Sequence, residues 1–145
     1  MLFNPGEKIF FKINTNLSLL RSSLFLACLA FSSFSYSKEI IISPGDDSQE
    51  RLQEAMILMS EGDTLVIKSG YYSFEDGLSL DVDNVIITGE GMDKTILDFK
   101  DQKSGAQGLL VTSDKVTLKD FAILDAKGDA LKVIGTKGIN MINLR

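Results

Sequence analysis

The spacing of apolar residues changes once along this chain, close to Gly62. Ahead of that glycine, an apolar stripe at helical spacing predicts a helix over residues 49–60, formed by Leu52, Ala55, Met56 and Met59. Beyond it, apolar and polar residues alternate with a period of two, which is typical of short strands. Residues 38–43 predict one further strand before the helix, ended by the turn residues that follow Pro44.

The part of the chain with strand periodicity also repeats itself. Leu109-Leu110-Val111 is matched by Leu131-Lys132-Val133 about 22 residues later. Lys115-Val116-Thr117-Leu118 is matched by Gly138-Ile139-Asn140-Met141 about 23 residues later, and Phe121 then corresponds to Leu144. An earlier and less regular unit has its three short strands at residues 78–80, 85–87 and 96–99.

Three strands this short bury too little apolar surface to be stable alone, so successive units must stack. The sequence therefore predicts an all-β fold, a right-handed parallel β-helix. Its inward side chains would be Leu109, Val111, Val116, Leu118, Phe121 and Ile123, stacked on Leu131, Val133, Ile139, Met141 and Leu144. A β-sandwich of antiparallel hairpins is the competing interpretation. It does not explain why similar residues recur at one fixed spacing along the chain.

Asp47 and Glu50 have the spacing of a capping box at the start of the predicted helix. The apolar stripe on this helix predicts core packing rather than ligand binding by Met56 and Met59.

The N-terminal segment has the layout of a secretory signal peptide. Lys8, Lys12 and Arg21 precede an apolar run over residues 22–34, which is too short to span a bilayer. We place cleavage after Ser37, which divides the chain into a signal peptide, residues 1–37, and a β-helix domain with its cap helix, residues 38–145. The prediction is a secreted or periplasmic protein.

Cys28 allows an alternative for the same segment. Leu26-Ala27-Cys28 is similar to the end of a bacterial lipoprotein signal, although Phe25 stands where leucine is usual. Cleavage before Cys28 would anchor the protein to the cell envelope through a lipid. Because Cys28 is the single cysteine, no intramolecular disulfide can form.

Composition restricts the chemistry. The chain has 145 residues, no histidine and a formal net charge of −5. Without histidine, any catalysis must use Asp, Glu, Lys, Arg or Tyr. No Lys/Arg-dense face is evident, so nucleic acid is not an expected partner.

Several motifs resemble one known family. Residues 52–56, Glu61-Gly62-Asp63-Thr64-Leu65-Val66-Ile67, Ser69-Gly70-Tyr71-Tyr72 and residues 85–97 resemble the opening of pectin-lyase-like right-handed β-helix proteins. The closest likeness is to exported bacterial parallel β-helix repeat proteins. The resemblance implies that the helix caps the N-terminal end of the coil. The superfamily includes pectate and alginate lyases, epimerases, glycoside hydrolases, tailspikes and accessory proteins, so the resemblance predicts fold better than activity.

Candidate site residues are few. Asp125 and Asp129 flank a turn beside Lys132. The two carboxylates could bind a cation together, with Lys132 beside them as a substrate-binding residue. Calcium as that cation is implied by family resemblance alone. The competing interpretation, which we favour, is that both aspartates serve the turn itself. No catalytic residue is assigned, and no cofactor is evident. The predicted outward positions are mixed and partly apolar: Ser79 with Asp81, Leu110 with Thr112, and Lys132 with Ile134.

Three other features have simple structural interpretations. Gly89-Glu90-Gly91 predicts a turn between strands rather than a phosphate loop. Of Tyr71 and Tyr72, one is expected in the core and the other at a coil edge, where it could stack on a sugar. Residues 100–107 form the longest interruption between coils and are a candidate for partner contact.

Residues 139–145 lie in the middle of a predicted coil, which indicates the N-terminal portion of a longer, truncated solenoid and predicts self-association of the isolated chain. Two functions remain open. One is a polysaccharide lyase or epimerase whose active groove lies beyond residue 145. The other is a non-catalytic exported scaffold that binds glycan or a partner protein.

Overall fold

The computed structural model describes residues 37–145. Within them it has one helix and ten strands. In chain order these are β1 Glu39–Ile42, α2 Ser48–Leu58, β2 Thr64–Ile67, β3 Gly70–Ser73, β4 Leu78–Leu80, β5 Ile86–Thr88, β6 Thr95–Asp98, β7 Gln107–Val111, β8 Thr117–Leu124, β9 Asp129–Val133 and β10 Asn140–Leu144. The predictions about the signal peptide and Cys28 concern residues outside this range, apart from Ser37 at its start.

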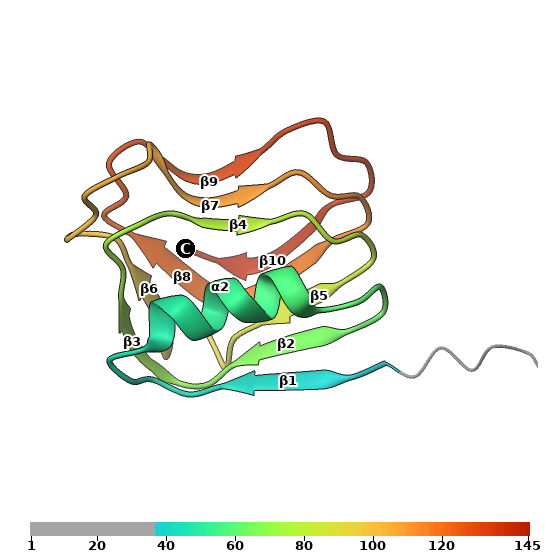
Figure 1. Ribbon diagram of the computed structural model, residues 1–145, viewed down its shortest axis with the longest axis horizontal. Helices are drawn as coiled ribbons and strands as arrows, with labels where there is room; N and C mark the ends of the chain where they lie inside the picture. The colour runs from blue at the N-terminus through green and yellow to red at the C-terminus, as the bar shows by residue number, and fades with distance from the viewer. Residues whose placement is uncertain (1–36) are drawn as a thin grey trace, which may run out of the picture. The chain divides into compact units, whose positions relative to one another are not determined.

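Every strand pair in the described residues is parallel. One ladder runs β1-β2-β5-β8-β10, a second β3-β6-β8 and a third β4-β7-β9 (Figure 1). The long strand β8 joins the first two, because Thr117–Lys119 pair with β5 and Ala122–Leu124 pair with β6. The fold is therefore all-β and β-helix-like, built from parallel sheets with one short helix. The antiparallel sandwich is wrong for this chain.

The register confirms the repeats read from the sequence. Leu109 lies opposite Leu131, and Val111 opposite Val133. Leu118 likewise lies opposite Met141, and Phe121 opposite Leu144. Sequence reasoning did not identify two pairings between units at the start of the stack, β1 with β2 and β3 with β6.

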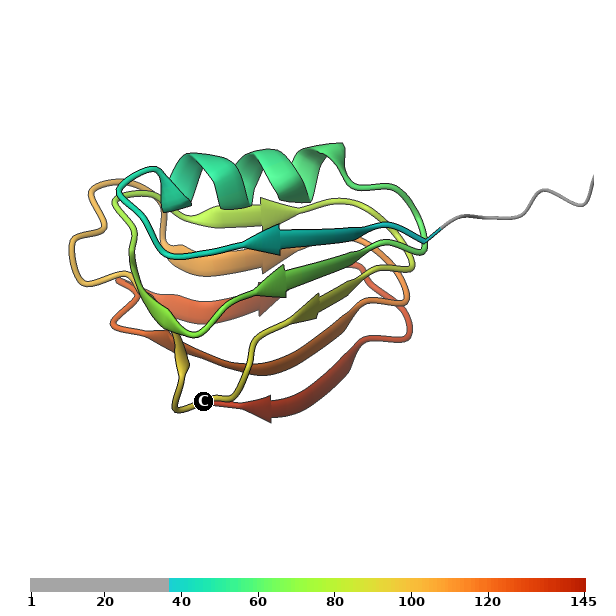
Figure 2. The same ribbon diagram turned by 90° about the horizontal axis from the view of Figure 1, so that it is seen from below.

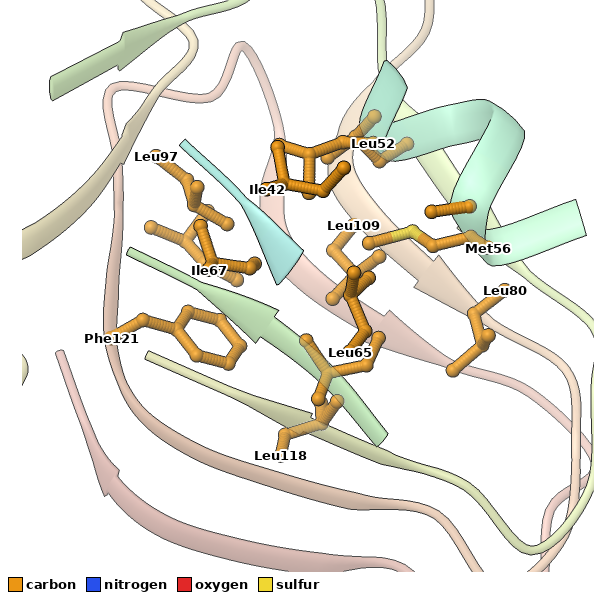
Figure 3. Packing of buried hydrophobic residues seen from close by; sticks show 14 of the residues in the cluster. Ile42, Leu52, Met56, Leu65, Ile67, Leu80, Leu97, Leu109, Leu118 and Phe121 are labelled. Carbon is orange, nitrogen blue, oxygen red and sulfur yellow. The ribbon is translucent and has the colours of Figure 1, made fainter. Parts of the chain in front are cut away.

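Alternation along the strands places one set of side chains in a common core (Figure 3). The six inward residues predicted on β7, on β8 and just before β8 are all buried. Their counterparts on the last unit are half-buried or exposed, and Met141 is 51% exposed. Each buried leucine or phenylalanine contributes about 1.5–3 kcal/mol through removal of apolar surface from water.

Helix α2 lies across the end of the stack formed by the first strands (Figure 2), packed against β1, β3 and β4. Its predicted apolar stripe is confirmed: Leu52, Ala55 and Met56 are buried, as is Met59 just after the helix. The helix begins one residue earlier and ends two residues earlier than predicted. No membrane-spanning helix is present in residues 37–145.

The predicted capping box is wrong. Asp47 is the N-cap residue of α2, but its side chain makes no capping hydrogen bond. Its Oδ1 instead lies 3.3 Å from Nη1 of Arg51, one turn along the helix. The Ser48 hydroxyl accepts a hydrogen bond from the Gly45 N–H at 2.7 Å and orders the turn before the helix. Asp47 has φ of −94° and ψ of 11°, which is not the extended backbone from which an N-cap carboxylate reaches the N–H groups of the first turn.

One corner of the stack repeats a left-handed backbone conformation. Gly62, Asn84, Lys115 and Gly138 all have positive φ, at 91°, 55°, 56° and 74°. At this corner the Gly62 N–H donates to the Asn84 carbonyl at 2.8 Å, which links successive units. Glycine tolerates this conformation because it has no Cβ, and asparagine tolerates it better than most other residues. A lysine in this conformation costs about 1–2 kcal/mol.

Lys115→Gly is therefore expected to stabilise the protein by roughly 0.5–1 kcal/mol. The substitution relieves the backbone strain of the folded state, and part of this gain is lost because glycine increases the conformational entropy of the unfolded chain. Urea unfolding followed by circular dichroism measures this change. Lys119→Gly, inside β8, is the matched control and should be destabilising by about 0.5–1 kcal/mol. Equal destabilisation by both substitutions would contradict the strain argument.

Candidate functional site

The residues singled out from the sequence lie at the last described unit. Asp125 is exposed in the connection from β8 to β9, with φ of 54°. Asp129 begins β9, and its Oδ2 is 3.8 Å from Nζ of Lys132. Residues 37–145 contain no group of three or more side chains placed to hold a metal ion. The turn role favoured for Asp125 agrees with its backbone conformation, and the cation site remains a prediction.

The outward face of β4 and β7 carries both polar and apolar side chains, as predicted. Ser79 and Asp81 are exposed, while Leu110 is half-buried. The Thr112 hydroxyl donates to Oδ1 of Asp81 at 2.9 Å, so these polar groups bond to each other across the sheet. This face offers no cluster of cationic side chains for an acidic substrate.

A larger feature lies at the other end of the stack, beside the start of α2. It is a polar hollow of about 840 Å³. One side is formed by the turn before α2 and by the first turn of the helix, and the other by β3 and the residues after it. Its lining residues are Gly45, Asp46, Asp47, Gln49, Glu50, Tyr71, Ser73, Glu75 and Asp76. We call it the Tyr71 hollow.

The adjacent tyrosines divide as the alternation of β3 requires. Tyr72 is 1% exposed, and its hydroxyl donates to the Lys68 carbonyl at 2.8 Å. Burial raises the pKa of Tyr72 to about 12. Tyr71 points the other way and is 61% exposed, with its hydroxyl donating to the Asp98 carboxylate. The predicted split between core and edge is confirmed, and the exposed ring lines the hollow.

Backbone and side-chain hydrogen bonds hold the rim of the Tyr71 hollow in place. Oε1 of Gln49 accepts the backbone N–H of Glu75 at 2.8 Å. Nζ of Lys103 lies 2.6 Å from Oε1 of Glu75, and the Ser104 hydroxyl donates to Asp76. The Glu75 carboxylate raises the pKa of Lys103. Lys103 and Ser104 belong to the loop predicted as a partner contact, so this loop supports one wall of the hollow.

Charge restricts what this hollow can accept. Five of its lining residues are carboxylates, and the basic groups beside them, Arg51 and Lys103, pair with Asp47 and Glu75. At neutral pH such a surface repels polyanions, because like charges raise the free energy of the bound state. Its carboxylates can accept hydrogen bonds from hydroxyl or amino groups. The arrangement therefore suits an uncharged or amino sugar better than a uronate.

Sequence reasoning identified Tyr71 but missed the acidic lining of the hollow. The lining comes from two segments separated in the chain, residues 45–50 and β3 with the residues after it, and a third segment, the loop with Lys103 and Ser104, braces Glu75 and Asp76. The repeated aspartates and glutamates around the helix start could have indicated an acidic surface there. Their approach to β3 depends on how the helix packs.

A second ordered polar cluster lies in the turn between β5 and β6, where a turn was predicted. Glu90 accepts hydrogen bonds from the Ser69 hydroxyl at 2.6 Å, the Ser69 N–H at 2.7 Å and Nζ of Lys68 at 2.9 Å. These bonds favour the ionised carboxylate and lower its pKa from 4.5 to about 2. All three bonds connect neighbouring units, so the cluster has a structural role.

Because the folded-state pKa of Glu90 is lowered, its stabilising effect is complete above pH 4.5 and is lost as the pH falls toward about 2. Glu90→Gln should reduce the pH dependence of the free energy of unfolding within this window. Urea titrations at a series of pH values measure the effect, with Glu61→Gln at an exposed turn position as the control. Parallel curves for Glu90→Gln and the unsubstituted protein would contradict this assignment.

Comparison with known proteins indicates the class of fold. No known family profile matches the sequence, and no curated protein sequence matches it. Among solved structures, the described fold is similar to that of alginate lyases of the PL6 family.

One matching structure is a single-residue mutant of the PL6 family alginate lyase AlyGC, with a TM-score of 0.57 and 18% sequence identity over 77% of this chain. The same lyase without that mutation matches with a TM-score of 0.47 and 19% identity over 75% of this chain. The matched region spans 16% of the lyase chain. At this identity the likeness concerns the fold alone.

Proposed function

We propose that residues 38–145 form the helical cap and first coils of a right-handed parallel β-helix protein that binds polysaccharide. Parallel ladders in register and the likeness to an alginate lyase fold support the architecture. Right-handed winding is the rule for parallel crossovers. Export through the signal peptide at residues 1–37, or lipid anchoring at Cys28, is part of the proposal and would bring the protein to extracellular or envelope glycans.

The observation that carries the binding proposal is the exposed ring of Tyr71 in a polar hollow of about 840 Å³. An aromatic ring offers an apolar face to the C–H face of a sugar, and polar groups around it can bond to the sugar hydroxyls. The Asp98 carboxylate holds the Tyr71 hydroxyl and limits rotation of the ring. Because the lining is acidic, the proposed ligand is an uncharged or amino glycan.

Affinity electrophoresis of the full chain through gels containing β-glucan, chitosan, alginate or pectate tests this proposal. Retardation by β-glucan or chitosan is expected, with none by the two polyuronates. Tyr71→Ala should weaken binding by roughly tenfold because stacking is lost. Tyr71→Phe keeps the ring and should bind nearly normally. Unchanged binding by Tyr71→Ala, or preferential binding of polyuronates, would overturn the assignment of this hollow.

A polysaccharide lyase or epimerase is the second candidate, favoured by the fold likeness to alginate lyase. In residues 37–145, Lys132 lies 3.8 Å from Asp129, and no catalytic role is assigned to this exposed pair. This candidate places the catalytic residues outside the described residues. Incubation with alginate and pectate, with absorbance used to detect unsaturated products, distinguishes this candidate from glycan binding without catalysis.

A further inference from the structure

The Asp63 carboxylate holds the backbone at the point where the chain enters its first strand. The N–H of Lys38, one residue before β1, donates to Oδ1 of Asp63 at 2.8 Å. Oδ2 of the same carboxylate accepts the N–H of Ser60, just beyond α2, at 2.8 Å. Asp63 therefore joins the start of β1 to the segment that leaves the helix.

Asp63 is buried, and its partners are mainly neutral groups. Its exposed fraction is 4%. The N–H groups of Ser60 and Lys38 hold the pKa of Asp63 below its ordinary value of 3.8, and the charge of the Lys38 side chain adds a weaker attraction. The carboxylate is therefore ionised at neutral pH. A buried carboxylate is stabilised more by a hydrogen-bonded positive charge than by neutral donors, since charge-assisted hydrogen bonds are the stronger ones.

The cleavage predicted from the sequence falls at this contact. Hydrolysis of the bond between Ser37 and Lys38 consumes one water molecule. The leader leaves with the new Ser37 carboxylate, and the Lys38 nitrogen becomes an α-ammonium, whose ordinary pKa is about 7.7–8.0. That nitrogen already lies 2.8 Å from Oδ1 of Asp63. The reaction would thus place a positive charge directly against the buried carboxylate.

The strand ladder would keep the new terminus in position. The Lys38 carbonyl accepts the N–H of Thr64 at 2.9 Å, and the next residue, Glu39, pairs with Thr64 in the β1–β2 register. Cleavage removes one contact, because the Ser37 hydroxyl donates to the Gly62 carbonyl at 2.6 Å. That bond is exposed and neutral, so its loss is expected to be smaller than the gain from the ion pair.

We propose that Asp63 is the binding site of the processed N-terminus, where the α-ammonium of Lys38 forms an ion pair that fixes β1 to the end of α2. The inference rests on the cleavage after Ser37 in the proposed function and does not involve the glycan site. Removal of the leader then stabilises the first strands. Cleavage before Cys28 would leave an amide at Lys38 and form no such pair.

Two full-length precursors that differ by one residue in the cleavage position test the proposal. In one, the enteropeptidase sequence Asp-Asp-Asp-Asp-Lys replaces residues 33–37, so that the protease leaves Lys38 as the N-terminus. In the other it replaces residues 32–36 and leaves Ser37. Both products carry one α-ammonium, but only the first places it at Asp63. Each precursor is cut after folding, and urea unfolding is followed by circular dichroism at pH 6.5, where α-amino groups are charged.

The product that begins at Lys38 should have an unfolding equilibrium constant roughly five- to tenfold lower than the product that begins at Ser37. With Asp63→Asn in both, the difference should disappear. Equal stability of the two unsubstituted products overturns the proposal, as does a difference that persists with Asp63→Asn.

A second measurement needs no substitution at Asp63, in case Asp63→Asn fails to fold. The reagent 2-pyridinecarboxaldehyde modifies N-terminal α-amines, and mass spectrometry follows the reaction. In the folded proteins the Lys38 terminus should react at least fivefold more slowly than the Ser37 terminus, and in urea the two rates should be similar. Equal rates in the folded proteins contradict an ion pair at Asp63.

The N-terminus of the exported protein separates this inference from the proposed export. Mass spectrometry of the natural sequence after secretion from a bacterial host should give Lys38 as the first residue. A terminus at Cys28 or elsewhere overturns the cleavage site and, with it, the pair in the processed protein. A terminus at Lys38 without the stability difference overturns the ion pair alone and leaves export standing.

Discussion

Phe99→Ala is expected to lower the free energy of unfolding by about 3–5 kcal/mol. Phe99 is fully buried and stacks on Phe74, with ring centroids 4.8 Å apart and ring planes at 24°. The two rings follow β6 and β3, which are neighbours in one ladder, so they join consecutive units inside the core. Alanine would leave a cavity between units and remove the stacking contact. Urea unfolding followed by circular dichroism measures the loss.

Two further substitutions make this result specific. Phe99→Leu keeps most of the apolar volume and should cost clearly less than alanine. Met92→Ala, at an exposed position in the turn between β5 and β6, should change stability by no more than about 0.5 kcal/mol. If Phe99→Ala were as mild as Met92→Ala, the stacked pair would not join the units as described.

Gly89→Ala should lower the free energy of unfolding by about 3 kcal/mol, because it forces atoms into a packed corner. A Cβ at this position would lie 2.2 Å from the carbonyl oxygen of Asp120 and 2.9 Å from Cβ of Thr95. The Asp120 oxygen belongs to the backbone of the next unit, so relief requires the β5–β8 ladder to shift. Gly89 itself donates to the Lys119 carbonyl at 2.9 Å, and this bond would be strained as well.

Gly45→Ala is the matched control for the corner glycine. Its new Cβ would lie 3.1 Å from Oδ1 of Asp47, the end of an exposed and flexible side chain. The expected change is within about 1 kcal/mol in either direction. Thermal unfolding of both variants measures the contrast. Similar melting temperatures for the two would show that the corner is less tightly packed than the structure indicates.

The sequence predicted much of the fold, because the relevant signal was local and periodic. A change from helical spacing to alternation marks the boundary between α2 and the strands after it, since each period places apolar residues on one face. The displacement of about 22 residues between Leu109 and Leu131 matched the observed register, because stacked parallel units place equivalent residues opposite each other. The pairing of β1 with β2 was not predicted, because α2 lies between these two strands in the chain.

The candidate site was less predictable. Asp47 had the right spacing for a capping box, yet its carboxylate pairs with Arg51. Tyr71 could be named as one of two candidates for the surface, but the alternation of β3 decided which tyrosine was exposed. The carboxylates around it converge from segments whose distance in space the sequence does not contain.

Periodicity in the chain by itself determined the parallel, stacked arrangement and the identity of its core residues, because backbone pairing and apolar burial depend on regular spacing. Tertiary packing alone decided that the helix start and β3 enclose an acidic hollow around Tyr71. It also decided that the Gln53 side chain bonds to the backbone of Ser79 and so joins α2 to β4. These contacts join side chains that are far apart in the sequence. Several hydrogen-bonding partners are possible for each side chain, and the packing of the helix against the strands decides which one it meets.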